Sequence, residues 1–332
     1  PDDIKTMDDF IKKVPTIDKA DIVKAQAKES PFGDVLAKSS IFQRFMTSGT
    51  TGVPMQLAYL HNTHIMTGDE WAYCYWTIGV RPADTFYIAF NFGTFVGFWI
   101  GYWGAFCLGC RVITGGGLNT KRRIDQIITM KPTVLLSTPT YALRMAEEAK
   151  SMGIDLSKSS IRITIHAGEA GASIPSTRKA IEDAWGAKTY DLYGIGEIHG
   201  IASECEMQDR LHVYEHHLHC LVVDEEGNEV KDGEVGEAVM TSFAQVAQPI
   251  IKYRTHDLVR WNKQKCPCGR TWAQFLGGVL GRTDNMITIK GTNVYPGAIE
   301  ALLGDVDGTL SLIHISEPTR PLYISYAVFC LK

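Results

Sequence analysis

The fold of this chain is decided by the stretch IRITIHAGEAGASIPSTRKAIEDAWGAKTYDL, residues 161–192. An apolar, β-branched run at 161–167 is typical of a buried strand. A helical pattern follows at 173–185, and a second strand pattern at 188–192. Two strands joined through a helix form a parallel pair with a right-handed connection. We therefore predict an α/β fold built on a largely parallel sheet.

The alternation of strands and helices continues towards the N-terminus. It predicts strands at 55–59, 85–91, 110–114 and 134–137, and helices at 61–80, 97–108, 121–130 and 139–151. Past residue 200 the pattern changes, because turn sequences separate apolar runs without helical periodicity. There we predict antiparallel strands at 212–223, 236–242 and 250–261, forming a β-rich subdomain that leans on the sheet.

Bulk properties limit the class of protein. The chain has 332 residues, 45% of them hydrophobic, and a net charge of −4, which does not favour a nucleic-acid partner. It contains no run of 18 apolar residues, so no membrane span is expected. Eight unevenly spaced cysteines do not form a disulfide scaffold, and the acidic start is unlike a signal peptide. These features predict a cytoplasmic, reduced protein.

A loop rich in glycine and hydroxyl residues, TSGTTGVP, occupies positions 47–54. Glycines let the backbone approach an oxyanion closely, and successive N–H groups and hydroxyls can wrap phosphate oxygens. The loop lacks the Gly-Lys-Ser/Thr ending of a Walker motif. Taken alone, such a cluster is more often an ordinary surface turn.

Three later motifs favour the phosphate-binding interpretation. They are DLYGIGE at 191–197, YRTHDL at 253–258 and GRTDNM at 281–286. Together with GEAG at 168–171, CPCGR at 266–270 and GTNVYP at 291–296, this order resembles the adenylate-forming enzymes, and most closely the phenylacetate–CoA ligase family. The resemblance covers about residues 1–309.

The resemblance implies an ATP-dependent, AMP-forming ligase. Such an enzyme joins a carboxylate, here an aryl or arylacetic acid, to AMP and then transfers the acyl group to coenzyme A. Adenylyl transfer to a deazaflavin, as in coenzyme F390 synthetases, and loading of a carrier protein are alternatives. A non-catalytic nucleotide-binding scaffold is a further alternative of another class. The resemblance also allows a homodimer.

The resemblance assigns roles to individual residues. The phosphates would be held by the loop residues Thr47, Ser48, Gly49, Thr50, Thr51 and Gly52. Glu197 would hold Mg²⁺, and Thr50 and Arg282 would act with it in catalysis. The nucleotide would also contact Gly168, Glu169, Asp191, Tyr193, Gly194, Asp257 and Arg282, and the hinge between half-reactions would lie at Asp284.

Three departures from the family pattern bear on these roles. His256 stands where relatives carry glycine before the ribose-binding aspartate, and Met55 follows the loop proline where most have lysine. Nothing matches the lysine that relatives place near the C-terminus; Lys290, before Gly291, is a weak candidate for approaching the site in the thioesterification state. We therefore expect nucleotide binding with poor turnover.

Aromatic residues after the predicted strand at 85–91 suggest the acyl pocket. We expect it to be lined by Phe92, Phe95, Phe98, Trp99, His166 and Ala167. The apolar wall suits an aromatic ring, although ordinary core packing would use the same residues.

Four residues suggest a structural zinc site. Three thiolates and one imidazole, from Cys205, His212, Cys266 and Cys268, match a tetrahedral Zn²⁺ ligand set. Buried cysteines that have no common function are the alternative.

The domain organisation follows from these motifs. Residues 1–280 would form the large domain, including the β-rich subdomain at 200–275, and 281–309 the hinge and the start of a small α+β domain. Residues 310–332 resemble a translated sequencing adapter, so we leave them out of fold reasoning and expect a fragment open at both ends. A genuine apolar tail is the alternative.

Overall fold

A computed structural model describes most of the chain. The described residues are 3–27, 43–47, 54–169, 171–244 and 247–283, with the backbone of four later strands, β14 (Ile287–Ile289), β15 (Thr292–Val294), β16 (Thr309–Leu312) and β17 (Phe329–Leu331). The strands β14 and β15 pair antiparallel with each other, as do β16 and β17. The central feature is an eleven-stranded sheet in the order β10-β11-β12-β13-β9-β8-β7-β6-β5-β3-β4.

One half of this sheet is parallel, as predicted. Its strands are β3 (Thr85–Ile88), β4 (Arg111–Thr114), β5 (Val134–Ser137), β6 (Ile163–His166) and β7 (Lys188–Ile195). The intervening helices are α4 (Val96–Cys107), α5 (Thr120–Met130), α6 (Pro139–Ser151) and α7 (Pro175–Trp185), with a short 3-10 turn η2 (Leu156–Lys158). The predicted elements of this half are therefore confirmed, with ends shifted by a few residues.

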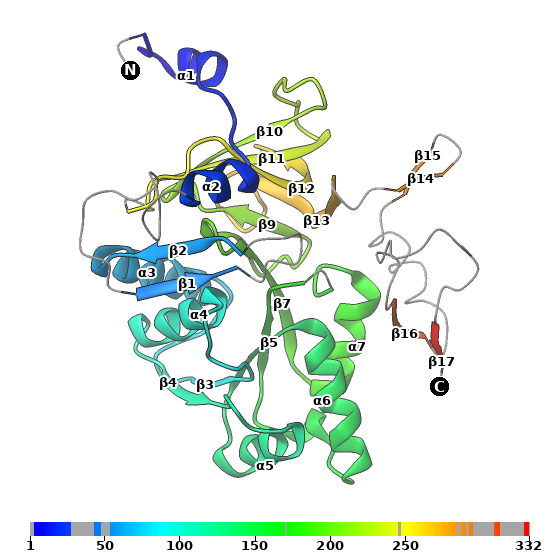
Figure 1. Cartoon of the computed structure of the whole chain (residues 1–332). Helices are drawn as coiled ribbons and strands as arrows, with labels where there is room; N and C mark the ends of the chain where they lie inside the picture. Colours follow the sequence, from blue (N-terminus) through cyan, green and yellow to red (C-terminus); the bar gives the residue numbers. More distant parts are fainter. Residues whose placement is uncertain are drawn as a thin grey trace, which may run out of the picture.

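Side chains alternate between the two faces of the parallel half because successive residues of a strand point in opposite directions. Tyr87 and Leu135 pack against α5, α6 and α7 in one apolar cluster, which also contains Trp185. Phe86 and Leu136 belong to a larger cluster on the other face, together with α4 and α3 (His61–Thr77). Figure 1 shows α5, α6 and α7 grouped on one side of these strands.

The antiparallel half differs from the sequence prediction in two ways. It consists of β8 (His199–Glu204), β9 (Arg210–Val213), β10 (Leu218–Val223), β11 (Val235–Ser242), β12 (Tyr253–Asn262) and β13 (Gln274–Arg282). The single strand predicted at 212–223 is wrong, because a turn in which His217 N–H donates to the Tyr214 carbonyl (2.9 Å) splits it into β9 and β10.

The second difference concerns how the two halves join. These strands were predicted to lean on the sheet as a subdomain, whereas they extend it. The reason is that β7 continues to Ile195, reverses direction and pairs antiparallel with β8, so that Leu192 lies opposite Ser203. The strand β8 thereby pairs with the edge of β7 that the parallel half leaves open. The sheet passes from parallel to antiparallel at β7 (Figure 1).

The N-terminal segment is held against the antiparallel half. Its helices α1 (Met7–Lys13) and α2 (Lys19–Gln26) begin at capping boxes formed by Thr6 with Asp9 and by Asp18 with Asp21. Between them, Ile17 N–H donates to the Lys252 carbonyl (3.0 Å), and Arg254 N–H donates to the Ile17 carbonyl (2.8 Å). This short bridge fixes where α2 starts.

Two further strands, β1 (Gln43–Met46) and β2 (Gln56–Tyr59), pair antiparallel on either side of the loop at 47–54. Within the described parts of the chain, no helix combines the length and apolar character that crossing a membrane requires.

Candidate functional site

The site lies at the carboxyl ends of the parallel strands, where open α/β sheets bind their ligands. Gly168 follows β6 with φ +93°, a left-handed conformation that favours glycine. Gly194 lies in β7, where a Cβ atom would come within 2.3 Å of the His199 carbonyl oxygen. Both glycines line one pocket, and at Gly194 the neighbouring strand leaves no room for a side chain.

The pocket has a largely apolar wall. Its lining includes the predicted acyl-pocket residues Phe95, Phe98 and Ala167. The remaining lining residues are Trp71, Phe90, Val96, Gly97, Ile100, Leu136, Gly168, Leu192, Gly194, Ile195, Gly196 and His199. Trp71 and His199 were not anticipated, because they come from α3 and β8, far in sequence from the aromatic segment.

Three other predicted pocket residues are not among the lining residues. Phe92 and Trp99 contact each other edge to face, with ring centroids 5.0 Å apart, and the Trp99 indole N–H donates to the Gly93 carbonyl (2.9 Å). His166 is fully buried, with Nδ1 3.2 Å from the Ser137 carbonyl oxygen. Burial lowers the pKa of His166 to about 4, so its imidazole is neutral.

The predicted ribose ligand, Asp257, is buried and held from two sides. Its Oδ2 accepts a 2.5 Å hydrogen bond from the Tyr193 hydroxyl, and its Oδ1 accepts one from Arg282 Nη1 at 3.0 Å. Asp257 and Arg282 are direct cross-strand partners in β12 and β13, which explains their contact. An ionised carboxylate has about four acceptor sites, and these two bonds use one on each oxygen.

His256, the residue before Asp257, has φ +63°. This left-handed conformation explains why the family pattern expects glycine there. Its backbone N–H donates to Glu237 Oε1 (3.1 Å), and its ring Nδ1 lies 3.2 Å from Thr283 Oγ1. The Thr283 N–H also donates to the His256 carbonyl (2.8 Å), so these contacts hold the strained residue in place.

Asp191, predicted to bind nucleotide, is buried and does not line the pocket. Its carboxylate accepts a hydrogen bond from Leu192 N–H (3.1 Å) and is hydrogen-bonded to Ser173, in the loop after β6. Burial raises its pKa to about 6, although the bond to Ser173 and the charge of Arg178 oppose this. Asp191 therefore fixes the loop that carries Gly168.

Glu169 also holds the loop after β6 in place. Its Oε1 accepts hydrogen bonds from both the backbone N–H (2.9 Å) and the hydroxyl of Thr140, in the first turn of α6. A carboxylate at a helix N-terminus satisfies otherwise unpaired N–H groups. These bonds tie the loop after β6 to α6, and Glu169 is exposed there.

Glu197, the predicted magnesium ligand, lies in the turn between β7 and β8 and is 7% exposed. The Lys19 ammonium is 3.9 Å from its Oε1. The Tyr253 hydroxyl is hydrogen-bonded to Glu197. The pKa of Tyr253 is raised, mainly by burial and in addition by the charge of this carboxylate. Lys19 was not identified from the sequence as a neighbour of Glu197, because the bridge at Ile17 that brings α2 to this turn is a tertiary contact.

The predicted phosphate loop at 47–54 is described only at its ends. Thr47 N–H donates to the Met55 carbonyl (3.0 Å), and Met55 N–H donates to Thr47 Oγ1 (3.0 Å). This neck lies beside the pocket, since a Cβ on Gly196 would be 3.6 Å from Thr47 Cγ2. The predicted residues Ser48, Gly49, Thr50, Thr51 and Gly52, and the hinge residue Asp284, lie outside the described residues.

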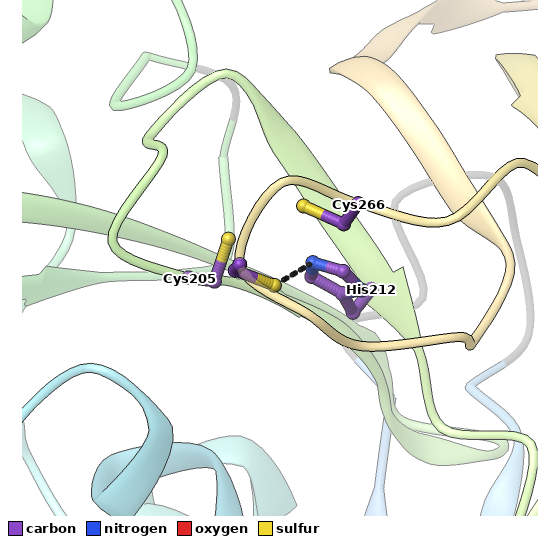
Figure 2. Close-up of side chains that lie close together, drawn as sticks. Cys205, His212 and Cys266 are labelled. Carbon is purple, nitrogen blue, oxygen red and sulfur yellow. Dashed lines mark hydrogen bonds between the residues drawn. The ribbon is translucent and has the colours of Figure 1, made fainter.

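The four predicted zinc ligands come together. The ligand atoms of Cys205, His212, Cys266 and Cys268 all lie within 4.8 Å of one another. Figure 2 shows Cys205, His212 and Cys266 facing one common point, and the dashed line is the 3.5 Å contact between Cys268 Sγ and His212 Nε2. Tight turns assemble the cluster, because Gly269 N–H donates to the Cys266 carbonyl (2.9 Å). Four converging soft ligands fit a tetrahedral metal.

Comparisons with known proteins agree with this geometry. Residues 5–248 match the family model described as "AMP-binding enzyme". The phenylacetate–coenzyme A ligase of Thermus thermophilus is 33% identical over 278 residues, which cover 82% of this chain and 62% of that protein. The enzyme of the same name from Aromatoleum evansii is 32% identical, covering 91% and 68% respectively.

A solved structure is also similar. A 2-hydroxyisobutyryl-CoA ligase in complex with an acyl-AMP superimposes with a TM-score of 0.87 at 30% identity, covering 93% of this chain and 66% of that one. The sequence match and the sheet with its terminal pocket define an α/β protein of the AMP-binding enzyme class. The chain belongs to the phenylacetate–CoA ligase family of the AMP-binding enzymes. It spans about two thirds of the length of the relatives it matches.

Proposed function

We propose that the protein to which this chain belongs is an ATP-dependent, AMP-forming acid–CoA ligase. The observation that carries the proposal is the hydrogen-bonded set Tyr193–Asp257–Arg282 beside the pocket at the carboxyl end of β6. It combines a buried acceptor for ribose with a guanidinium suited to phosphate or ribose oxygens. Family membership supports carboxylate, ATP and coenzyme A as substrates.

In the proposed reaction the carboxylate attacks the α-phosphorus of ATP, and pyrophosphate leaves. Coenzyme A then attacks the acyl carbon, and AMP leaves. The protein contributes mainly alignment and charge stabilisation. Asp257 would orient the ribose, and Arg282 would stabilise the negative charge that develops on the phosphate oxygens. Thr50 and the rest of the loop at 47–52 would hold phosphate oxygens.

The acid is proposed to be aryl or arylacetic. Phe90 stacks on Phe98 with ring centroids 3.9 Å apart, and the Phe95 ring lies 5.0 Å from Phe98 at a tilt of 56°, so three aromatic rings form one side of the pocket. Such a wall suits an aromatic ring. The phenylacetate specificity named for the relatives supports the same class.

Glu197 is proposed to hold Mg²⁺, which when bound neutralises charge on the phosphate oxygens. The residue fits this role, because it is a nearly buried carboxylate in the turn beside the Thr47 neck. The 3.9 Å contact with Lys19 supplies a positive charge next to the carboxylate. A cation bound at Glu197 would therefore share the site with a lysine.

The cluster of Cys205, His212, Cys266 and Cys268 is proposed to hold a structural Zn²⁺. It joins the end of β8, β9 and the turn before β13, and it lies apart from the pocket lining. We expect about one zinc per chain by atomic emission. Cys268→Ser should lose the metal and lower the melting temperature, while Cys220→Ser, at a buried cysteine outside the cluster, should retain it. Equal metal contents in the two variants would contradict the site.

The nucleotide function is tested by thermal stabilisation. A sulfamoyl analogue of phenylacetyl-AMP should raise the melting temperature more than AMP does, because only the folded site binds it. Asp257→Ala should abolish both shifts. Stabilisation by AMP alone would reject the arylacetyl group, and a folded protein stabilised by neither compound would reject the adenylation site.

Acceptor, location and assembly complete the proposal. Coenzyme A is the proposed acceptor, in a cytoplasmic homodimer without a nucleic-acid or membrane partner. Adenylyl transfer to a deazaflavin would be seen as ATP consumption and pyrophosphate release that depend on the deazaflavin. Loading of a carrier protein would be seen as acyl-AMP consumption and AMP release with the carrier and not with coenzyme A.

A further inference from the structure

We propose that Glu70 and Trp71 form a polar floor in the acyl pocket and select acids with a hydroxyl or amino group at the end remote from the carboxylate. The inference deepens the proposed ligase function and rests on it. Both residues lie on α3, which no motif of the nucleotide site includes. They would act as specificity-determining residues for the same reaction.

Two buried polar atoms converge beside the pocket. A Cβ atom placed on Gly200 would lie 2.5 Å from Glu70 Oε1 and 3.0 Å from Trp71 Nε1. Gly200 packs directly against Gly194, because a Cβ on Gly194 would be 3.3 Å from the Gly200 Cα. Since Trp71, Gly194 and His199 line the pocket, this small space borders its interior.

Neither atom has a hydrogen-bond partner among the described residues. Glu70 is 1% exposed and Trp71 is 4% exposed, so water does not reach them freely. A buried polar group without a partner costs about 1–3 kcal/mol, and such groups call for an explanation. The Tyr59 hydroxyl, near the same carboxyl group, also lacks a partner in the described part of the chain. A ligand that enters the pocket would provide one.

Electrostatics favours a neutral, hydrogen-bonding ligand group. Burial raises the pKa of Glu70 well above its usual range, which favours the protonated carboxylic acid. A protonated carboxyl both donates and accepts, and an indole N–H only donates. A hydroxyl or amino group can pair with both, whereas a second carboxylate would have to be buried without a cation.

The phosphate loop marks one side of the pocket. The lining residue Gly196 adjoins Thr47, the start of that loop, and Gly168 follows β6. Trp71, on α3, and Ile100, on α4, belong to the same lining. In the proposal, an acyl-adenylate lies with its phosphate near the loop and the far end of its acyl group towards α3. The polar floor then contacts the substituent on that far end.

The test compares two probes on the full chain by calorimetry. They are the sulfamoyl-adenosine analogues of phenylacetyl-AMP and 4-hydroxyphenylacetyl-AMP. Wild type should bind the hydroxylated analogue about tenfold more tightly, as one net neutral hydrogen bond predicts. Glu70→Leu should weaken that analogue by tenfold or more and leave the phenylacetyl analogue unchanged or tighter. Glu70→Gln, which keeps a donor and an acceptor, should retain part of the preference.

Thr67→Val is the matched control. Thr67 is buried on the same helix, but its hydroxyl already donates to the Thr63 carbonyl (2.9 Å), so the preference should not change. Equal wild-type affinities, an unchanged preference in Glu70→Leu, or parallel loss of both analogues would overturn the polar floor. Binding of AMP without either analogue would overturn it too, whereas loss of AMP binding as well would reject the proposed function itself.

Discussion

Replacing His256 by glycine and by alanine gives a sharp test of the nucleotide-site backbone. Alanine is ordinarily more stable than glycine within a strand by about 0.5–1 kcal/mol, because glycine loses more chain entropy on folding. His256 has φ +63°, where a Cβ atom costs about 1–2 kcal/mol. The two effects oppose each other, so His256→Gly should be more stable than His256→Ala by roughly 0.5–1 kcal/mol.

The comparison is internally controlled. Both variants lose the same imidazole, with its contacts to Thr283 Oγ1 (3.2 Å) and Glu237 Oε1 (3.5 Å), so these losses cancel. Urea denaturation followed by circular dichroism measures the difference. With an m-value of about 3 kcal/mol/M, the midpoint of the glycine variant should lie about 0.2–0.3 M higher. A midpoint for alanine equal to or above that of glycine would refute the left-handed backbone at His256.

Three further predictions concern charge and protonation. Asp257→Asn should weaken AMP binding by about tenfold to a hundredfold in calorimetry, because the ribose loses a charged acceptor and Arg282 loses its carboxylate; an unchanged affinity would exclude Asp257 from the ribose site. Glu197→Gln should abolish the gain in ATP affinity that Mg²⁺ gives the wild type, while AMP affinity stays the same; a retained gain would place the metal elsewhere. Burial lowers the pKa of His166 to about 4 and that of His199 to about 3. Below pH 6.5 the unfolded chain therefore binds protons at these two imidazoles that the folded chain does not bind. The stability that they contribute is present above about pH 6.5 and is lost as the pH falls towards 4. His166→Gln should reduce the slope of unfolding free energy against pH in that range by up to about 1.4 kcal/mol per pH unit, and an unaltered slope in urea melts would show that His166 is not buried neutral.

Local patterns determined the parallel half of the fold. Apolar runs such as 134–137 and 163–166, with helices between them, specify βαβ units almost without reference to distant residues. The capping boxes at Thr6 and Asp18 are local as well, since each requires only residues three positions apart. The motifs around Asp257, Arg282 and Gly168 could be identified from the sequence because each role depends on residue type within a short segment.

The tertiary structure decided the rest. Whether β9 pairs with β13 or with β10 depends on competing edges of similar composition, so the sequence could not give the strand order of the antiparallel half. Lys19 reaches Glu197 only because Ile17 bonds to the start of β12. In the sequence, Glu70 looks like an ordinary polar residue of a helix. Only the packing of α3 on Gly200 shows that Glu70 is buried beside the pocket. Sequence fixes short-range geometry, whereas burial and partners arise from contacts between segments that are distant along the chain.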